Sequence, residues 1–165
     1  MNSKIIDKCR KIKLVISDVD GVLTDGGMYY SKDGETLKKF NTKDGIGIEL
    51  LLERNIKTIL ITREESSITI SRGKKLQVEK ILSGILDKEN ELKNICREYN
   101  VTPDEIAYVG DDINDLKIMN CVGLKCTPVD GVEKIKKIAD YICRAEGGKG
   151  VLREISELIL TYNKN

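Results

Sequence analysis

Three short apolar runs rich in β-branched residues constrain the fold of this chain most strongly. They occupy residues 13–17, 56–62 and 105–111, and two weaker runs of the same kind lie at 121–126 and 139–144. Continuous apolar runs of this length are typical of parallel strands that are buried on both faces. We therefore expect a central, mostly parallel β-sheet.

Helical periodicity fills the segments between these runs. Apolar residues recur at helical spacing within residues 45–55, 88–99, 113–120, 131–139 and 150–162. An alternation of strands and helices is typical of the α/β class, in which helices flank the sheet. No linker divides the 165 residues, so we predict a single domain over residues 1–165.

One segment interrupts the alternation. Residues 26–41 read GGMYYSKDGETLKKFN, with Asp33 and Gly34 between two runs that favour strands. An Asp-Gly pair in such a position is a signal for a β-hairpin. We expect a hairpin inserted directly after the first strand.

The composition limits the partners and the location of the protein. Hydrophobic residues make up 40% and charged residues 33%, which is typical of a soluble globular protein. The net charge of +1 gives no reason to expect a nucleic acid partner. No apolar run approaches the length of a membrane span, and the N-terminus lacks the pattern of a signal peptide. We expect a cytoplasmic protein without a membrane partner.

The chain contains no histidine and five cysteines. Without histidine, Ser-His-Asp and Cys-His catalysis and the usual zinc sites are excluded. The cysteines form no C-x-x-C pair, so we interpret them as reduced thiols. Acid–base chemistry must then use carboxylates, lysine or tyrosine.

Polar side chains stand at the carboxyl ends of the predicted strands. Asp18 and Asp20 follow the first run, Thr62 ends the second, and the sequence GDDIND at 110–115 ends the third. Lys88 opens a helix after the sequence ILSGIL. Ligands of open α/β sheets bind outside the carboxyl ends of the strands, so we expect these side chains to converge.

The carboxylates in this set indicate a cation. Asp18 and Asp20 are two positions apart at the end of an extended segment, and Asp111 approaches from another strand. Oxygen ligands suit a hard cation such as Mg²⁺, which would also offset the repulsion between the carboxylates. Taken alone, each feature has a structural alternative, such as a turn, a helix cap or a solvated helix position. Their joint occurrence at strand ends favours a functional site.

The same residues resemble the haloacid dehalogenase (HAD) superfamily of phosphotransferases. The superfamily pattern is D-x-D-G, a Ser or Thr after the second motif strand, a downstream Lys and G-D-D-x-x-D, which here are DVDG (18–21), Thr62, Lys88 and GDDIND (110–115). The segments DVDGVLTDGGMYY, KKFNTKDGIGI, AYVGDDIND and GGKGVLRE also resemble one subgroup of small phosphatases. That subgroup includes 3-deoxy-D-manno-octulosonate (KDO) 8-phosphate phosphatases and acylneuraminate or KDN 9-phosphate phosphatases. The resemblance spans roughly residues 12–160.

The resemblance implies a HAD-like Rossmannoid fold without a cap domain and a two-step hydrolysis of a phosphate ester. Asp18 is then the nucleophile that forms an aspartyl-phosphate, and Asp20 is the general acid and base. Thr62 donates a hydrogen bond to the phosphoryl group, and Lys88 supplies a fixed positive charge. Mg²⁺ is held by Asp18, by Asp111 and by the backbone carbonyl of Asp20.

Further residues are expected around this centre. Three of them support waters on the metal or orient Lys88, and these are Asp112, Asn114 and Asp115. The expected substrate-binding residues are Thr42, Asp44, Arg63, Glu64, Lys149 and Arg153. The substrate implied is a phosphorylated 3-deoxy-2-ulosonic acid with eight or nine carbons.

Two segments leave alternatives open. The second motif of the family usually reads T-G-R or T-G-E, and here Arg63 replaces the glycine. A larger side chain could narrow the approach of backbone to phosphate, or Arg63 itself could contact an anion; Glu64 at the next position resembles the nine-carbon members. The sequence GGKG at 147–150 is either the turn before a helix or a flexible segment that reaches a neighbouring subunit.

The resemblance also implies a homotetramer. In the subgroup, the hairpin that matches residues 26–41 builds the tetramer, and a neighbouring subunit covers the active site. Three other interpretations are a phosphosugar mutase, a response-regulator receiver domain and a non-catalytic oligomerisation module associated with sugar-nucleotide synthesis. The presence of Asp18 and Asp20 favours an active enzyme.

Overall fold

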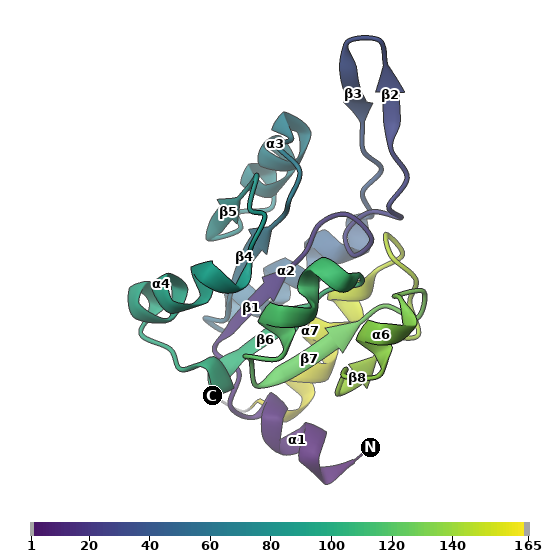
Figure 1. Cartoon of the computed structure of the whole chain (residues 1–165). Helices are drawn as coiled ribbons and strands as arrows, with labels where there is room; N and C mark the ends of the chain where they lie inside the picture. Colours follow the sequence, from purple (N-terminus) through teal and green to yellow (C-terminus); the bar gives the residue numbers. More distant parts are fainter. Residues whose placement is uncertain (1, 164–165) are drawn as a thin grey trace.

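A computed structural model describes residues 2–163, and its centre is a parallel β-sheet (Figure 1). Within these residues the sheet has six strands in the order β5-β4-β1-β6-β7-β8, and each printed pairing is parallel. The strands are β1 Leu14–Ser17, β4 Lys57–Ile61, β5 Lys80–Leu82, β6 Ile106–Val109, β7 Leu124–Thr127 and β8 Tyr141–Ile142. The predicted α/β class and the mostly parallel sheet are confirmed.

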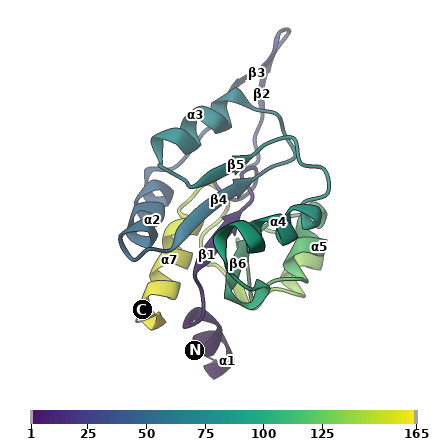
Figure 2. The same ribbon diagram turned by 90° about the vertical axis from the view of Figure 1, so that its left-hand side faces the viewer.

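Helices cover both faces of the sheet. Figure 2 shows α2 and α7 on one side and α4 and α5 on the other. The helices are α1 Ser3–Cys9, α2 Thr42–Glu53, α3 Ser67–Lys75, α4 Glu89–Tyr99, α5 Leu116–Met119, α6 Glu133–Lys136 and α7 Val151–Tyr162, with 3₁₀ turns η1 at Pro103–Glu105 and η2 at Ile113–Asp115. No described helix is both long and apolar enough to cross a membrane.

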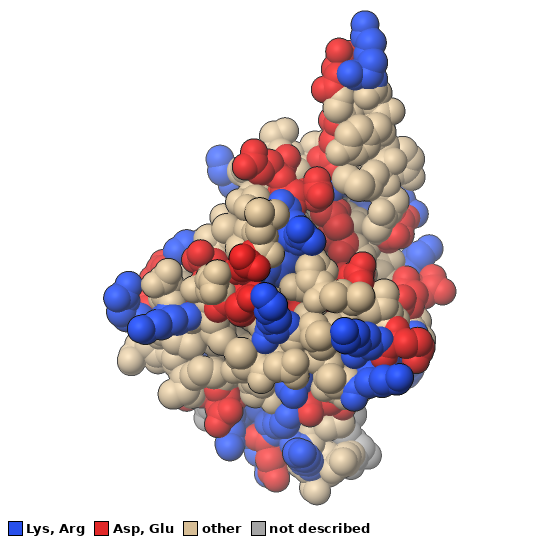
Figure 3. All heavy atoms as spheres, viewed as in Figure 1, with Lys and Arg blue, Asp and Glu red and all other residues tan. Residues whose placement is uncertain are grey.

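The predicted hairpin is present between β1 and α2. It consists of β2 Tyr29–Ser31 and β3 Gly34–Leu37, which pair with each other in an antiparallel manner and form a sheet of their own. The hairpin projects from the body of the molecule, and in Figure 3 its stem is largely uncharged while its tip carries charged side chains. The exposed apolar residues of this segment are Met28, Tyr29, Tyr30 and Leu37.

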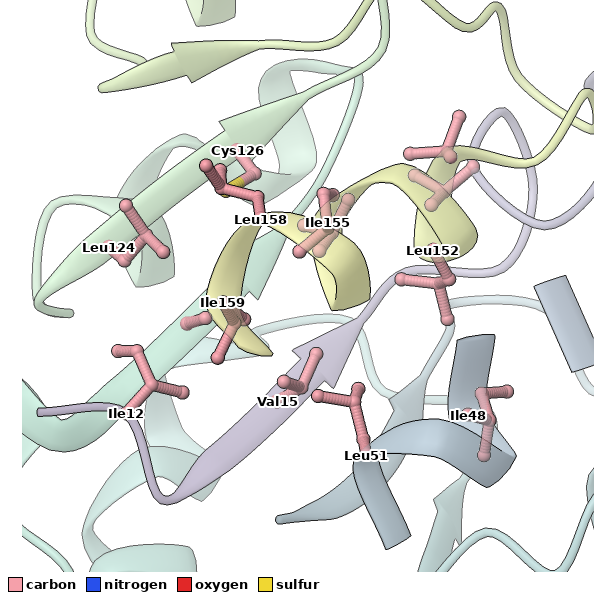
Figure 4. Close-up of a cluster of buried hydrophobic side chains, with 14 of the residues drawn as sticks. Ile12, Val15, Ile48, Leu51, Leu124, Cys126, Leu152, Ile155, Leu158 and Ile159 are labelled. Atoms are coloured by element: carbon pink, nitrogen blue, oxygen red, sulfur yellow. The ribbon is translucent and has the colours of Figure 1, made fainter. Parts of the chain in front are cut away.

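Alternate residues of the central strands β1, β4 and β6 enter different hydrophobic clusters. Val15 of β1 packs in the cluster that includes α2 and α7, where Leu51 and Ile155 lie close by (Figure 4). Leu14 and Ile16 point to the opposite face and pack with residues of α4, α5 and α6. Burial on both faces explains why the strands read as continuous apolar runs.

Three elements were not predicted from the sequence, namely α1, α3 and β5. The α3 sequence SITISRGKK is rich in residues with low helix propensity. It is nevertheless helical because Ser66 caps its start by accepting a hydrogen bond from the Thr69 amide at 3.3 Å. Gly73 lets the helix approach Ile81 of β5, since a Cβ there would lie 2.5 Å from the Ile81 side chain.

Candidate active site

Most of the predicted site residues lie where the strand order reverses. Strand β1 lies between β4 and β6, so Asp18, Thr62 and Asp111 emerge side by side at the carboxyl edge. This is the place where open α/β sheets bind ligands. A cleft of about 730 Å³ opens here. Its lining residues are Asp18, Asp20, Gly21, Gly26, Thr62, Arg63, Glu64, Leu86, Asp111, Asp112, Ile113 and Asn114.

Lys88 lies below the cleft and is fully buried. Its Nζ atom is 2.7 Å from Oδ2 of Asp18 and 2.8 Å from Oδ1 of Asp115. Burial acts to lower the pKa of Lys88, but the two carboxylates outweigh it and raise the pKa. Lys88 therefore stays charged and compensates the buried acids.

Asp115 uses both of its oxygens to organise this centre. Oδ1 also accepts a hydrogen bond from the Tyr108 hydroxyl at 2.6 Å, and Oδ2 accepts from the backbone amides of Asp111 at 3.0 Å and Asp112 at 3.4 Å. Asp115 thus holds Lys88 and the loop after β6 in place. Tyr108 was not predicted as a site residue, because it occupies an ordinary apolar position of a strand.

The remaining acids fit a hard divalent cation. Oxygens of Asp18, Asp111 and Asp115 lie within 4.8 Å of one another. Asp18 and Asp111 line the cleft, whereas Asp115 does not and is engaged by Lys88, Tyr108 and two backbone amides, so Asp18 and Asp111 are the candidates to bind a cation. Oδ1 of Asp111 is buried without a hydrogen-bond partner among residues 2–163. Burial, followed by the charges of Asp115 and Asp112, raises the pKa of Asp111 to about 7. A bound cation would relieve both the repulsion and the missing contact.

Gly21 permits the close approach of the DVDG loop after β1 to Asp111 in the loop after β6. Its backbone has a φ of +86°, which residues that carry a side chain rarely adopt. A Cβ atom at this position would lie 2.0 Å from Oδ2 of Asp111. The glycine of the DVDG motif is therefore required both by the turn and by the carboxylate opposite it.

Among the described residues, the Asp20 carboxylate is held through only one of its two oxygens. Its Oδ1 atom is 2.6 Å from Nζ of Lys38 and 3.4 Å from the hydroxyl of Thr24. Its Oδ2 atom is buried and has no hydrogen-bond partner within residues 2–163. The sequence did not indicate Lys38, because the direction in which the hairpin places its side chains depends on the fold.

The loop after β4 contributes a hydroxyl and two charges. Thr62 is buried, and its Oγ1 accepts a hydrogen bond from the Glu64 amide at 3.2 Å. Because Oγ1 accepts from this amide, the hydroxyl proton is free to be donated to a ligand. Arg63 and Glu64 are exposed and line the cleft. Arg63 therefore brings a positive charge to an otherwise acidic cleft.

Four predicted substrate-binding residues lie outside this cleft. Thr42 is exposed at the start of α2. Asp44 is buried and accepts a hydrogen bond from the Leu152 amide at 2.8 Å, at the start of α7. Burial raises the pKa of Asp44 to about 6, against the effect of backbone amides at this helix start. In the single chain Asp44 is a helix cap and not a ligand of the cleft.

The remaining two lie at the GGKG segment. Lys149 is exposed, and Arg153 pairs with Glu157 at 2.6 Å. Gly148 donates a backbone hydrogen bond to Val22 at 2.9 Å, and a Cβ at Gly147 would lie 2.3 Å from the Gly21 carbonyl. The segment is thus a turn before α7 that packs on the DVDG loop of its own chain.

Comparison with protein families gives a match over most of the chain. A model of the haloacid dehalogenase-like hydrolases matches residues 51–155. The KDO 8-phosphate phosphatase of Haemophilus influenzae is 36% identical over 153 residues, which cover 93% of this chain and 85% of that protein. The enzyme of the same name from Escherichia coli K12 is 35% identical over 160 residues, which cover 97% and 85%.

Solved structures agree with these relationships. The KDO 8-phosphate phosphatase of Moraxella catarrhalis, in complex with a magnesium ion, a phosphate ion and KDO, superimposes with a TM-score of 0.95 at 35% identity. The alignment covers 100% of this chain and 95% of that one. A cobalt-bound phosphatase of H. influenzae gives a TM-score of 0.91 at 35% identity and covers 94% and 91%.

Proposed function

The chain belongs to the haloacid dehalogenase-like hydrolase family and is a sugar-phosphate phosphatase, and we propose that its substrate is 3-deoxy-D-manno-octulosonate 8-phosphate. One observation supports the phosphatase mechanism most directly. Asp18 lies at the floor of the cleft with its charge held by Lys88 at 2.7 Å. Two residues further on, Asp20 lines the same cleft, and its buried Oδ2 atom has no hydrogen-bond partner among the described residues. This pair is suited to nucleophilic attack and proton transfer.

The reaction has two displacements. An oxygen of Asp18 attacks phosphorus and forms an aspartyl-phosphate while the bond to the sugar oxygen breaks. Asp20 gives its proton to the departing sugar oxygen and then takes a proton from the water that hydrolyses the intermediate. The Thr62 hydroxyl donates to a phosphoryl oxygen, and Lys88 keeps the charge of Asp18 compensated.

We propose that Mg²⁺ is the metal that completes the site. Asp18, Asp111 and the backbone carbonyl of Asp20 would hold it, while Asp112 and Asn114 stand at the cleft where waters on the metal could be bound. When bound, Mg²⁺ would neutralise charge between the nucleophile and the phosphoryl group.

The choice of sugar rests on two different arguments. The two relatives from H. influenzae and E. coli are named for the eight-carbon substrate, whereas Glu64 resembles the residue of the nine-carbon members, whose substrate is an acylneuraminate or KDN 9-phosphate. Arg63 lines the cleft with a positive charge, which suits the carboxylate of either 2-ulosonic acid. We place the eight-carbon substrate first because the relationship extends over nearly the whole chain.

We also propose a homotetramer of cytoplasmic subunits. The exposed apolar residues Tyr29, Tyr30 and Leu37 give the projecting hairpin a surface suited to packing against copies of the chain. Lys149 and Arg153 lie at the protein surface, where they could contact the substrate of a neighbouring subunit.

A substrate panel tests the proposed function. Purified protein with Mg²⁺ should release phosphate from KDO 8-phosphate faster than from acylneuraminate 9-phosphate, KDN 9-phosphate or a common hexose phosphate. Asp18→Asn should abolish turnover of all of them. Asp25→Asn is the matched control, since Asp25 lies in the same loop but is exposed and pairs with Lys39 at 2.9 Å. Turnover by Asp18→Asn would contradict the mechanism, and an inactive wild type would favour the non-catalytic alternative.

A further inference from the structure

Lys38 is a buried cation that the mechanism above does not use. It follows strand β3, and its side chain is only 1% exposed although the neighbouring hairpin residues are largely exposed. Its Nζ atom lies 2.6 Å from Oδ1 of Asp20 and 2.9 Å from Oε1 of Glu35. A lysine is rarely buried unless it is paired, and here one of its two partners is the general acid of the proposed reaction.

The contact with Lys38 leaves the two oxygens of Asp20 in different environments. Oδ1 is held by Lys38 and approached by the Thr24 hydroxyl. Oδ2 is buried, and no described residue binds it. A carboxylate that is fixed through one oxygen has a defined direction for the other. A proton shuttle needs such a direction, because misplacement by about 1 Å can reduce the rate by roughly 100-fold.

Lys38 is itself held by a second contact. Glu35 pairs with Lys38 through Oε1 and accepts a hydrogen bond from the Ser66 hydroxyl through Oε2 at 2.5 Å. Ser66 is buried and caps α3. The chain of contacts from Asp20 through Lys38 and Glu35 to Ser66 therefore connects the hairpin to the body of the molecule, and the lysine is not free to follow the motions of an exposed loop.

We propose that Lys38 is a positioning residue that orients Asp20 for proton transfer in this enzyme. By binding Oδ1, it directs Oδ2 toward the oxygen that leaves phosphorus. In the first displacement, the bond from Asp18 to phosphorus forms, the bond to the sugar oxygen breaks, and the proton on Oδ2 moves to that oxygen. In the second, water forms a bond to phosphorus, the bond to Asp18 breaks, and the proton of water returns to Oδ2. The inference rests on the proposed function, since it assigns a role within that reaction.

Comparison of two leaving groups separates positioning from a merely structural effect. A sugar oxygen needs a proton as it leaves, whereas 4-nitrophenolate leaves without one. The parameter to compare is kcat/KM, which includes only the steps up to departure of the leaving group. The substrates are KDO 8-phosphate and 4-nitrophenyl phosphate. The variants are Lys38→Met, which keeps the length of the side chain, and Lys38→Arg, which keeps its charge.

The expected result is a selective loss. Lys38→Met should lower kcat/KM for the sugar phosphate by roughly 10- to 100-fold, which is the scale of a misplaced or weakened general acid, and for the aryl phosphate by less than about threefold. Lys38→Arg should recover a large part of the loss. Lys39→Met is the matched control, because Lys39 is the neighbouring lysine but is exposed and pairs with Asp25; its two values of kcat/KM should equal those of wild type.

Two results with Lys38→Met would overturn the inference. Equal losses on both substrates in Lys38→Met would show that Lys38 only supports the structure of the site, and this would overturn the inference while leaving the proposed function intact. Unchanged activity in Lys38→Met would overturn it as well. If wild-type protein hydrolyses neither compound, the proposed function fails and the inference fails with it. If wild type hydrolyses another sugar phosphate instead, that ester replaces KDO 8-phosphate in the same comparison.

Discussion

The Nζ atom of Lys88 lies 2.7 Å from Oδ2 of Asp18, and both side chains are buried. Asp18 follows the central strand and Lys88 stands at the start of α4, so the pair joins two parts of the chain that are 70 positions apart. Burial and the charge of Asp115 raise the pKa of Asp18, and Lys88 opposes this rise. Lys88 therefore favours the ionised form of Asp18, which is the form that the proposed reaction requires.

We expect Lys88→Met to destabilise the fold and to abolish turnover. Removal of one partner from a buried ion pair leaves an uncompensated charge and costs about 3–5 kcal/mol. Urea unfolding, followed by circular dichroism, measures the loss of unfolding free energy, and phosphate release measures activity.

Lys117→Met is the control for Lys88→Met. Lys117 is exposed and pairs with Glu89 at the surface at 2.8 Å, so its replacement should leave both measurements within error. The double variant Lys88→Met/Asp115→Asn should regain part of the lost unfolding free energy, since it removes one of the two buried carboxylates that Lys88 compensates. It should stay inactive. Wild-type activity in Lys88→Met would contradict the role assigned to this residue.

Gly21→Ala should remove cation binding. The new Cβ would lie 2.0 Å from Oδ2 of Asp111, so the carboxylate must leave the position in which it is available to a cation. The increase in melting temperature on addition of Mg²⁺, which follows from binding to the folded state, should be lost.

Gly34→Ala separates this clash from backbone strain. Gly34 has a φ of +112° in the hairpin, but a Cβ there would meet nothing within 4 Å. Both variants carry the strain of a positive φ, which costs about 1–2 kcal/mol. Only Gly21→Ala should lose the response to Mg²⁺, and an equal response in the two variants would refute the proposed metal position.

Cation binding should weaken as the pH falls below about 7. Burial, followed by the charges of Asp115 and Asp112, raises the pKa of Asp111 to about 7 in the cation-free protein. Below that pH a cation must displace a proton, so its affinity falls with pH. Calorimetric titration with Mg²⁺ in buffers of different ionisation enthalpy should show proton release near pH 6. Asp111→Asn should bind the cation more weakly and release fewer protons, by up to about one per cation bound.

Five of the six strands of the main sheet, and the residues at their ends, could be predicted from the sequence for a physical reason. A parallel sheet buries both faces of its strands, which produces continuous apolar runs, and the carboxyl ends of such strands lie at one edge. Asp18, Thr62 and Asp111 could therefore be expected to converge before their distances were known. Their catalytic roles stay predictions.

Other features depend on packing between distant segments. Lys38 reaches Asp20 because of the direction of a hairpin that does not pair with the main sheet. Asp44 lies outside the cleft because α2 packs against α7, where the carboxylate accepts a hydrogen bond from the Leu152 amide. The residues of α3 have low helix propensity, and contacts with Ser66 and β5 stabilise the helix. None of these contacts leaves a periodic pattern in the sequence.

The buried carboxyl of Asp44 should make the fold less stable as the pH rises from 4 to 6. Burial raises its pKa from the ordinary value of 3.8 to about 6, so in this range the folded state holds a proton that the unfolded state has already released. Stability then decreases with pH across the window and levels off above pH 6. Each pKa unit corresponds to about 1.4 kcal/mol, so the total effect is about 3 kcal/mol.

Asp44→Asn tests this directly, because an amide has nearly the same shape and does not titrate in this range. Urea unfolding at pH 4, 5, 6 and 7 should show that the free-energy difference between wild type and Asp44→Asn shifts by about 2.4 kcal/mol against wild type as the pH rises, because the rest of the total effect falls outside this range. Asp7→Asn removes an exposed carboxylate of α1 and controls for the change of net charge, so its curve should follow wild type. Parallel curves for wild type and Asp44→Asn would show that Asp44 is ionised in the fold throughout this range, held by the amides at the start of α7.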